Sequence, residues 1–257
     1  MSTNVPPPLP TALNGNNNLF ASIDMGSNSF KLLIVQVDPS TSHFLTLECH
    51  KKHDILISRH VPSAHSRFIA TSAIRESANK SQFIYSIHET LGIQVDVLSG
   101  SEEARLIYLG VLQFHQVYNN MILTIDIGGG SMEFVIGHQD KILYSISLQL
   151  GHLTLTKIFP KVKKMQEHIR SVIFDTDLVS QVKEYNIEKV IGLSGTMRKI
   201  EKTVFKGYTR ELEEHVQELD EFHRDWSFNQ EDLKRLVKIF INEEKEKGVK
   251  KRRNKFF

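Results

Sequence analysis

Cysteine, long apolar runs and net charge are all scarce in this chain of 257 residues. Cys49 is the single cysteine, which excludes an internal disulfide and favours a reducing compartment, so we expect a cytoplasmic protein. No stretch approaches the roughly 18 consecutive apolar residues that a membrane helix requires, so we expect no membrane partner. The net charge is only +2. The charge is unevenly spread, because residues 245–255 are strongly basic. We interpret this stretch as a solvated helix end, with nucleic-acid contact as the disfavoured alternative.

Residues 1–18 lack the basic segment and apolar core of a secretory signal. They are instead rich in proline and asparagine, a composition that cannot bury a core, and we expect a disordered leader over 1–18. In the whole chain, apolar residues make up 40% and charged residues 24%, which is ordinary for a globular protein. The length allows two modest domains.

The sequence contains two copies of one short motif, at residues 22–30 and 124–132. The aspartate of the first copy, Asp24, returns 102 residues later as Asp126, and the glycines and serines after it keep the same spacing. Each copy begins in a short apolar run that ends near the aspartate, and each continues into another apolar run. Two such runs around a turn of small residues predict a β-hairpin in each half.

The turn residues of both hairpins are candidates for phosphate binding, because backbone N–H groups that no bulky side chain covers can converge on an anionic oxygen. An aspartate just before such a turn repels a phosphate unless a metal ion or a water lies between them. Ordinary hairpin turns are the alternative, but the repetition of the motif favours a pair of phosphate turns. The candidate phosphate-binding residues are Gly26, Ser27, Asn28, Ser29, Gly128, Gly129, Gly130 and Ser131.

The remaining pattern repeats in the same order in the two halves. In the first half it predicts strands at 44–47, 67–71 and 93–98, and helices at 77–91 and from 99 to about 113. In the second half it predicts strands at 142–148 and 190–193 and a helix near 164–184, followed by polar helices. We therefore expect two α/β domains of related plan, 19–120 and 121–257, with a cleft between them.

Five segments together, at 24–30, 70–76, 99–105, 125–133 and 194–196, resemble the exopolyphosphatase / guanosine pentaphosphate phosphohydrolase (Ppx/GppA) family. That resemblance implies an α/β fold of duplicated ribonuclease-H-like (actin-like) domains with an interdomain cleft. It also implies an enzyme that hydrolyses the terminal phosphoanhydride of polyphosphate, or the 5′-terminal phosphate of guanosine pentaphosphate, with Mg²⁺. A homodimer stays open.

The same resemblance implies roles for individual side chains. Glu103 is expected to be the general base that takes a proton from the attacking water. Arg75 is expected to neutralise charge on the transferring phosphoryl group, with a surface ion pair as the alternative. The expected Mg²⁺ ligands are Asp24 and Asp126, with Glu133 a weaker candidate. The neighbour Glu102 should point elsewhere, because adjacent side chains on a helix diverge.

The chain also departs from the family pattern. Met132 stands where family members have threonine. Only about residues 58–66 connect the third strand to the next one, whereas a parallel return normally needs a dozen or more residues. We therefore expect a shortened first-domain crossover that leaves one face of the first sheet bare, and a truncated C-terminus with an incomplete second domain. The alternative functions are a non-catalytic phosphate or nucleotide sensor and a sugar or acetate kinase, the latter disfavoured by the paired glutamates at 102–103.

Overall fold

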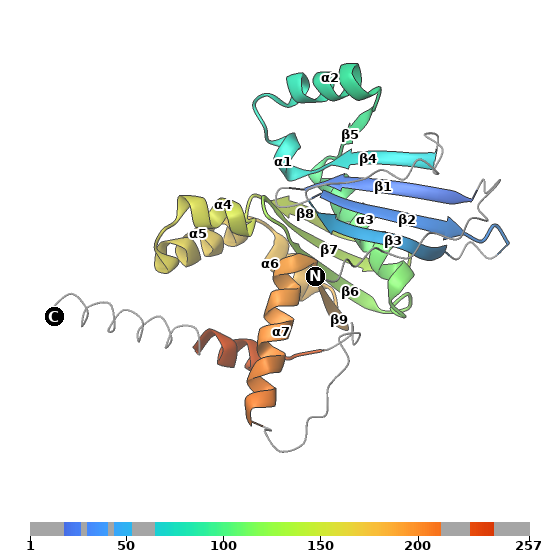
Figure 1. Ribbon diagram of the computed structural model, residues 1–257. Helices are drawn as coiled ribbons and strands as arrows, with labels where there is room; N and C mark the ends of the chain where they lie inside the picture. The colour runs from blue at the N-terminus through green and yellow to red at the C-terminus, as the bar shows by residue number, and fades with distance from the viewer. Residues whose placement is uncertain (1–17, 27–29, 41–43, 53–64, 212–226, 239–257) are drawn as a thin grey trace, which may run out of the picture. The chain divides into compact units, whose positions relative to one another are not determined.

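The computed structural model describes residues 18–26, 30–40, 44–52, 65–211 and 227–238 (Figure 1). The chain divides into two compact units, Met1–Leu106 and Ile107–Phe257, which we call unit 1 and unit 2. The division falls inside helix α3 (Gly100–Phe114). The expected leader over 1–18 lies outside the described residues except for Asn18, and the expected domain limits stay a prediction.

Unit 1 contains a five-stranded sheet in the order β3-β2-β1-β4-β5. The three antiparallel strands are β1 (Leu19–Met25), β2 (Phe30–Val37) and β3 (Phe44–Lys52), and the two parallel strands are β4 (Ser66–Ala70) and β5 (Val95–Val97). Met25 at the end of β1 is opposite Phe30 at the start of β2. The predicted first hairpin and its third strand are therefore confirmed.

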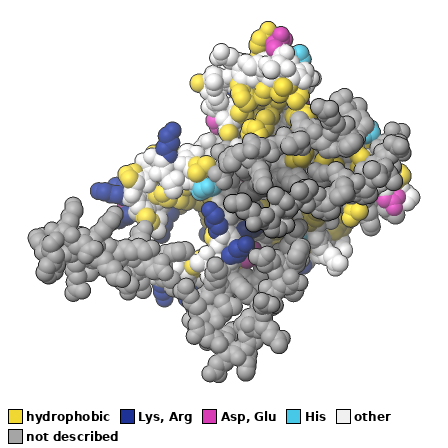
Figure 2. Space-filling view, viewed as in Figure 1, with side chains coloured by type: hydrophobic (Ala, Val, Ile, Leu, Met, Phe, Trp, Pro, Cys, Tyr) yellow, Lys and Arg dark blue, Asp and Glu magenta, His cyan; other side chains and the backbone are white. Residues whose placement is uncertain are grey.

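The helices of unit 1 are α1 (Ser72–Arg75), α2 (Lys80–Leu91) and the first part of α3. Gly92 ends α2 in the left-handed conformation (φ 65°) and donates its N–H to His88 O at 2.8 Å, a common glycine termination. Apolar side chains gather beneath α2, where Ile84 and Ile87 pack towards the cluster of Met25, Ala70 and Val95 (Figure 2). The helix therefore rests on the sheet through one apolar face.

One face of the first sheet is buried along β1 and β2. Ala21, Ile23, Leu32 and Ile34 alternate along β1 and β2 and are only 2–8% exposed. These residues all lie on a single face of the sheet, so the expectation that the other face is bare stays a prediction. The connection that we expected to be too short lies largely outside the described residues, and β4 nonetheless pairs with β1 in parallel.

Unit 2 contains a sheet in the order β8-β7-β6-β9. Its antiparallel strands are β6 (Met121–Ile127), β7 (Met132–His138) and β8 (Lys141–Leu148), and the parallel strand is β9 (Lys189–Leu193). Its helices are α4 (His152–Ile158), α5 (Val162–Phe174), α6 (Leu178–Glu184) and α7 (Ser194–Glu211), with residues 230–238 also helical. The core lies between the sheet and α4–α6, where Leu150, Leu155 and Leu178 are buried against Phe134 and Ile136.

The single helix predicted near 164–184 is wrong, because two helices, α5 and α6, occupy that stretch. Thr176 lies between them, donates its hydroxyl to Ile173 O at 2.7 Å and accepts the N–H of Leu178 at 3.4 Å. Such side-chain bonds compete with the helical ladder and end α5 here. Helices α1 and α4 were not predicted at all.

The two sheets share their irregularities as well as their strand order. The β2–β3 pairing shifts register between Ile34 and Val35, and the β7–β8 pairing shifts between Ile136 and Gly137, at the same spacing as the repeated motif. Such a shift is a local feature of the fold and is retained with it. The predicted duplicated α/β fold is confirmed; the cleft between its halves stays a prediction. The second sheet has four strands among the described residues, where the first has five.

None of the helices among the described residues is long and apolar enough to cross a membrane.

Candidate functional site

The turn between β6 and β7, residues 128–131, is the best-defined candidate site, and we call it the glycine turn. The N–H of Gly128 donates to Ser131 O at 3.0 Å and closes the turn. The pairing of β6 with β7 continues up to the turn, where Ile127 is opposite Met132. The predicted second hairpin is thus confirmed, and the turn begins at a fixed register.

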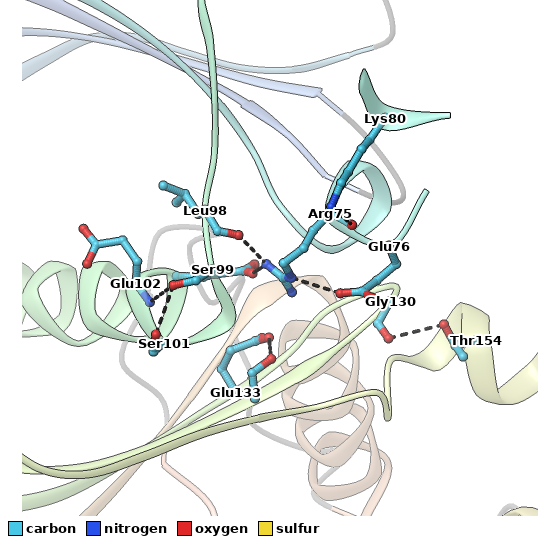
Figure 3. A network of polar contacts seen from close by, with 12 residues as sticks. Arg75, Glu76, Lys80, Leu98, Ser99, Ser101, Glu102, Gly130, Glu133 and Thr154 are labelled. Carbon is cyan, nitrogen blue, oxygen red and sulfur yellow. Dashed lines mark hydrogen bonds and ion pairs between the residues drawn. The ribbon is translucent and has the colours of Figure 1, made fainter. Parts of the chain in front are cut away.

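The start of α4 packs against the glycine turn and binds its carbonyl groups. Each of the three glycine carbonyls accepts two hydrogen bonds, between 2.9 and 3.3 Å long. One of them, from the Thr154 hydroxyl to Gly130 O, is drawn in Figure 3. The donors are His152 N and Nδ1 to Gly128 O, Leu153 N and Thr154 N to Gly129 O, and Gly151 N and Thr154 Oγ1 to Gly130 O.

These bonds determine where the N–H groups of the turn point. In a planar trans peptide the N–H is directed opposite to the C=O of the same peptide. Since three successive carbonyls face α4, the N–H groups of Gly129, Gly130 and Ser131 face away from it. Successive N–H groups of this kind can bind an anion, which is the chemistry predicted for this turn.

Gly151 permits this contact and was missed by the sequence reasoning. A Cβ atom at this position would overlap the backbone of Gly129 and Gly130, so the close approach requires glycine. The sequence does show a glycine soon after the predicted strand 142–148. It does not show that the turn at residues 128–131 packs against this glycine.

The turn between β9 and α7 supports the same region from another side. Ser194 donates its hydroxyl to Ile127 O at 2.7 Å and adopts the left-handed conformation (φ 74°), which is uncommon for a residue other than glycine. Thr196 Oγ1 lies 3.3 Å from His152 Nδ1. The segment 194–196, recognised in the sequence without a role, therefore contacts the residues that hold the glycine turn.

Asp126 and Glu133 are directly opposite each other on β6 and β7, so their side chains share one face of the sheet. Glu133 is 2% exposed and accepts the Ser147 hydroxyl at 2.8 Å. Carboxylates opposite each other destabilise a sheet through like-charge repulsion, and a cation or a shared proton relieves it. The structure therefore brings together two residues that the sequence predicted as separate metal ligands.

The first hairpin differs at the equivalent position. Asp24 is opposite Lys31, and the Lys31 Nζ lies 3.4 Å from Asp24 Oδ2. Asp24 Oδ1 is buried and has no hydrogen-bond partner among the residues that the structure describes. Of the phosphate-binding residues predicted in this turn, Gly26 is described, and Ser27, Asn28 and Ser29 lie outside the described residues.

Arg75 and Glu103 meet in unit 1 although 28 residues separate them. Arg75 Nη1 donates to Glu103 Oε2 at 2.8 Å and to Leu98 O at 2.9 Å, and Nε donates to Glu76 Oε1 at 3.1 Å (Figure 3). Both side chains of the Arg75–Glu103 pair are 15% exposed. Burial alone would lower the pKa of Arg75, but the hydrogen bond and charge of Glu103 outweigh it, so the pKa lies above its ordinary value. The two predicted catalytic residues thus form one partly buried ion pair.

Glu102 points to a different partner, as expected. Its two carboxylate oxygens accept hydrogen bonds from Arg105 Nε and Nη2 at 2.8 Å each, and its side chain is 39% exposed. The start of α3 is capped by Ser99, whose hydroxyl accepts the N–H of Glu102 at 3.1 Å. The adjacent glutamates therefore have separate surroundings, and only Glu103 is held by Arg75.

The carboxylates of unit 2 could supply two of the ligands of a Mg²⁺ ion. Among the described residues, no three His, Cys, Asp or Glu side chains are grouped so that they could bind a metal together. Magnesium commonly keeps several waters and needs only one or two protein carboxylates, however. Asp126 with Glu133 supplies two on one face of a sheet. Whether the predicted site residues bind Mg²⁺ stays a prediction.

The protein has a duplicated α/β fold in which an aspartate precedes a tight turn in each half, and N–H groups like those of the glycine turn can bind an anion. The chain belongs to the Ppx/GppA phosphatase family, because the model of that family matches residues 48–257. The resemblance inferred from the sequence motifs is confirmed.

Two relatives illustrate the family. A bifunctional 3-dehydroquinate synthase/phosphatase from Fusobacterium nucleatum is 33% identical, over 56% of this chain and 27% of that protein. A guanosine-5′-triphosphate,3′-diphosphate pyrophosphatase from Vibrio vulnificus is 26% identical, over 73% of this chain and 44% of that protein. The chain thus spans less than half the length of either relative.

Solved structures agree. An exopolyphosphatase from Cytophaga hutchinsonii superimposes with a TM-score of 0.66 at 25% identity, covering 87% of this chain and 80% of that one. The PPX-GPPA enzyme of Aquifex aeolicus gives a TM-score of 0.57 at 25% identity, covering 73% and 71%.

Proposed function

We propose that this protein is a phosphoanhydride hydrolase that releases the terminal phosphate of inorganic polyphosphate or of guanosine pentaphosphate. The observation that carries the proposal is the glycine turn, where three carbonyls are held by α4 and three N–H groups face the other way. Family membership supports the reaction class, and the two substrates are those of relatives described as an exopolyphosphatase and a guanosine pentaphosphate enzyme. We further expect a cytoplasmic location, because Cys49 is the only cysteine.

In this proposal the N–H groups of Gly129, Gly130 and Ser131 bind oxygens of a substrate phosphate. Asp126 and Glu133 would hold Mg²⁺, and the bound ion would supply charge neutralisation for the phosphate oxygens. Asp24 is a weaker ligand than Asp126, because Lys31 already balances part of its charge. Its buried Oδ1 has no hydrogen-bond partner among the described residues, so this oxygen would be the one available to a hydrated ion.

Glu103 is the proposed general base. A water oxygen forms a bond to the terminal phosphorus, the bridging P–O bond breaks, and the proton of the water passes to Glu103. Arg75 fixes the orientation of Glu103 through its bond to Oε2. Arg75 Nη2 is buried and has no hydrogen-bond partner among the described residues, so it can donate to the transferring phosphoryl group.

Phosphate release from polyphosphate and from guanosine pentaphosphate, each with and without Mg²⁺, tests the proposal. We expect Mg²⁺-dependent release from at least one substrate. If both compounds bind and neither releases phosphate, the proposed hydrolase function is wrong and a non-catalytic phosphate sensor is the better assignment. Absence of both binding and release would reject phosphate chemistry at the glycine turn.

A further inference from the structure

His152, the first residue of α4, binds one carbonyl of the glycine turn twice. Gly128 O accepts the backbone N–H of His152 at 3.0 Å and lies 2.9 Å from its ring Nδ1. A carbonyl oxygen has two lone pairs, so a single residue occupies both. The carbonyl of Gly130, by contrast, binds donors from two different residues.

The geometry assigns the ring proton. Because a carbonyl oxygen only accepts hydrogen bonds, Nδ1 must carry the hydrogen. The same N–H faces Thr196 Oγ1 at 3.3 Å, which therefore also accepts. In the neutral ring, Nε2 is then the nitrogen without a hydrogen. The imidazole thus connects three segments of unit 2: the glycine turn, α4 and the turn that opens α7.

The bond from the ring controls the direction of a second group. Gly128 C=O and Gly129 N–H belong to one planar peptide and point in opposite directions. The glycines on both sides of this peptide impose little restriction of their own on its rotation. Fixing the carbonyl of Gly128 therefore fixes the N–H of Gly129 on the side of the turn away from α4.

We propose that His152 is a positioning residue that aims the Gly129 N–H at an anionic oxygen of the substrate phosphate. This inference rests on the proposed function of the glycine turn. This N–H binds a phosphate oxygen in both the bound substrate and the transition state. His152 therefore stabilises both states equally and does not lower the barrier between them. Its loss is expected to raise KM and to leave kcat nearly unchanged.

Three variants of one position test the proposal. His152→Ala removes the ring. His152→Asn keeps an N–H donor at the same number of bonds from Cα as Nδ1, and His152→Gln places its donor one bond further out. The measurements are KM and kcat for phosphate release and the dissociation constant for tripolyphosphate. A ¹⁵N-resolved NMR spectrum of the wild-type ring reports the position of its hydrogen independently of activity.

The expected result is a rise in KM and in the dissociation constant of about tenfold for the Ala and Gln variants, with the Asn variant close to wild type. The NMR spectrum should show hydrogen on Nδ1. Equal KM values in an active wild type and all three variants would overturn the inference while leaving the proposed function intact. A hydrogen on Nε2 alone would overturn it too. A wild type that neither binds nor hydrolyses phosphate compounds would reject both proposals. Where the Ala variant does not fold, the Asn and Gln pair gives the same comparison.

Discussion

Glu102 and Glu103 are chemically identical neighbours that differ in their partners, Arg105 for the first and Arg75 for the second. We predict that Glu103→Gln lowers kcat by about a hundred- to ten-thousand-fold, the usual contribution of a general base, with little change in substrate binding. Glu102→Gln is the matched control and should be much milder, because its carboxylate is bound at the surface. Rates of phosphate release measure both.

A near-wild-type kcat for Glu103→Gln would remove this residue from the role of base. The side-chain carbonyl of the introduced glutamine can still accept a hydrogen bond from Arg75. A loss of folding is therefore not expected, and a thermal melt of each variant checks it.

At the scale of elements, the contact between α4 and the glycine turn depends on Gly151. Gly151→Ala introduces a methyl group that overlaps the backbone of Gly129 and Gly130. We predict an unfolding free energy lower by about 1–3 kcal/mol, as for other overpacked sites, together with weaker binding of tripolyphosphate. Urea denaturation and calorimetry measure the two effects.

Gly110→Ala is the matched control for this prediction. Gly110 lies inside α3, and an added Cβ would have no heavy atom within 4 Å. Alanine should therefore stabilise the protein by about 0.5–1 kcal/mol through helix propensity. Two substitutions with the same added methyl group are expected to act in opposite directions, and an equal loss of stability in both would contradict the packing argument.

Helix α3 is tied to the second sheet by Tyr108. The ring is fully buried, an added Cβ at Gly137 would overlap it, and the hydroxyl donates to Gln139 O at 2.8 Å. Burial, with smaller contributions from Asp140 and Tyr118, raises the pKa of Tyr108 to about 12 from its ordinary 10.0. The folded protein therefore retains a proton that the unfolded chain loses above pH 10.

This shift predicts a pH dependence of stability. The contribution of Tyr108 is fully present below pH 10 and is lost as the pH rises towards 12. Between pH 10 and pH 12 the unfolded chain releases the Tyr108 proton while the folded protein still keeps it, so a rise in pH lowers the free energy of unfolding.

Deprotonation at pH 11 therefore favours the unfolded chain, and the wild type should lose about 1.4 kcal/mol more than Tyr108→Phe between pH 9 and pH 11. At pH 7 the variant itself should be about 1 kcal/mol less stable, because it lacks the bond to Gln139. Urea midpoints at three pH values measure these differences; parallel curves would show that Tyr108 titrates normally.

At the scale of the whole molecule, the sequence predicted two kinds of feature: the local hairpins and the repetition of one plan in the two halves. The hairpins followed from apolar runs around Asp24 and Asp126, and the related plan of the halves followed from their spacing. The ion pair of Arg75 with Glu103 could not be derived, because its geometry depends on the close approach of α1 to the start of α3. The hydrogen bonds between α4 and the glycine turn were missed for the same reason. A seven-residue helix has little periodicity, and Gly128, which His152 binds, lies 24 residues earlier in the chain.

Binding of Mg²⁺ should be visible in the stability of the molecule. At a Mg²⁺ concentration a hundred times its dissociation constant, linkage gives about 2.7 kcal/mol, which corresponds to a rise in Tm of about 5 °C or more for a chain of this size. Thermal melts with Mg²⁺ and with a chelator measure this rise. Asp126→Asn and Glu133→Gln should reduce it strongly and Asp24→Asn only weakly; an equal reduction in all three would contradict the assignment to unit 2.

The two copies of the motif differ in the residue opposite the aspartate. Asp24 is opposite the positively charged Lys31, whereas Asp126 is opposite the negatively charged Glu133. The first copy carries its counterion covalently, as an ammonium group that dilution cannot remove. Under the proposed function, the second copy takes a cation from its surroundings and can lose it again. In the first half the chain itself then balances part of the charge of the motif, and in the second half the balance of the proposed cation site follows the free concentration of divalent ions.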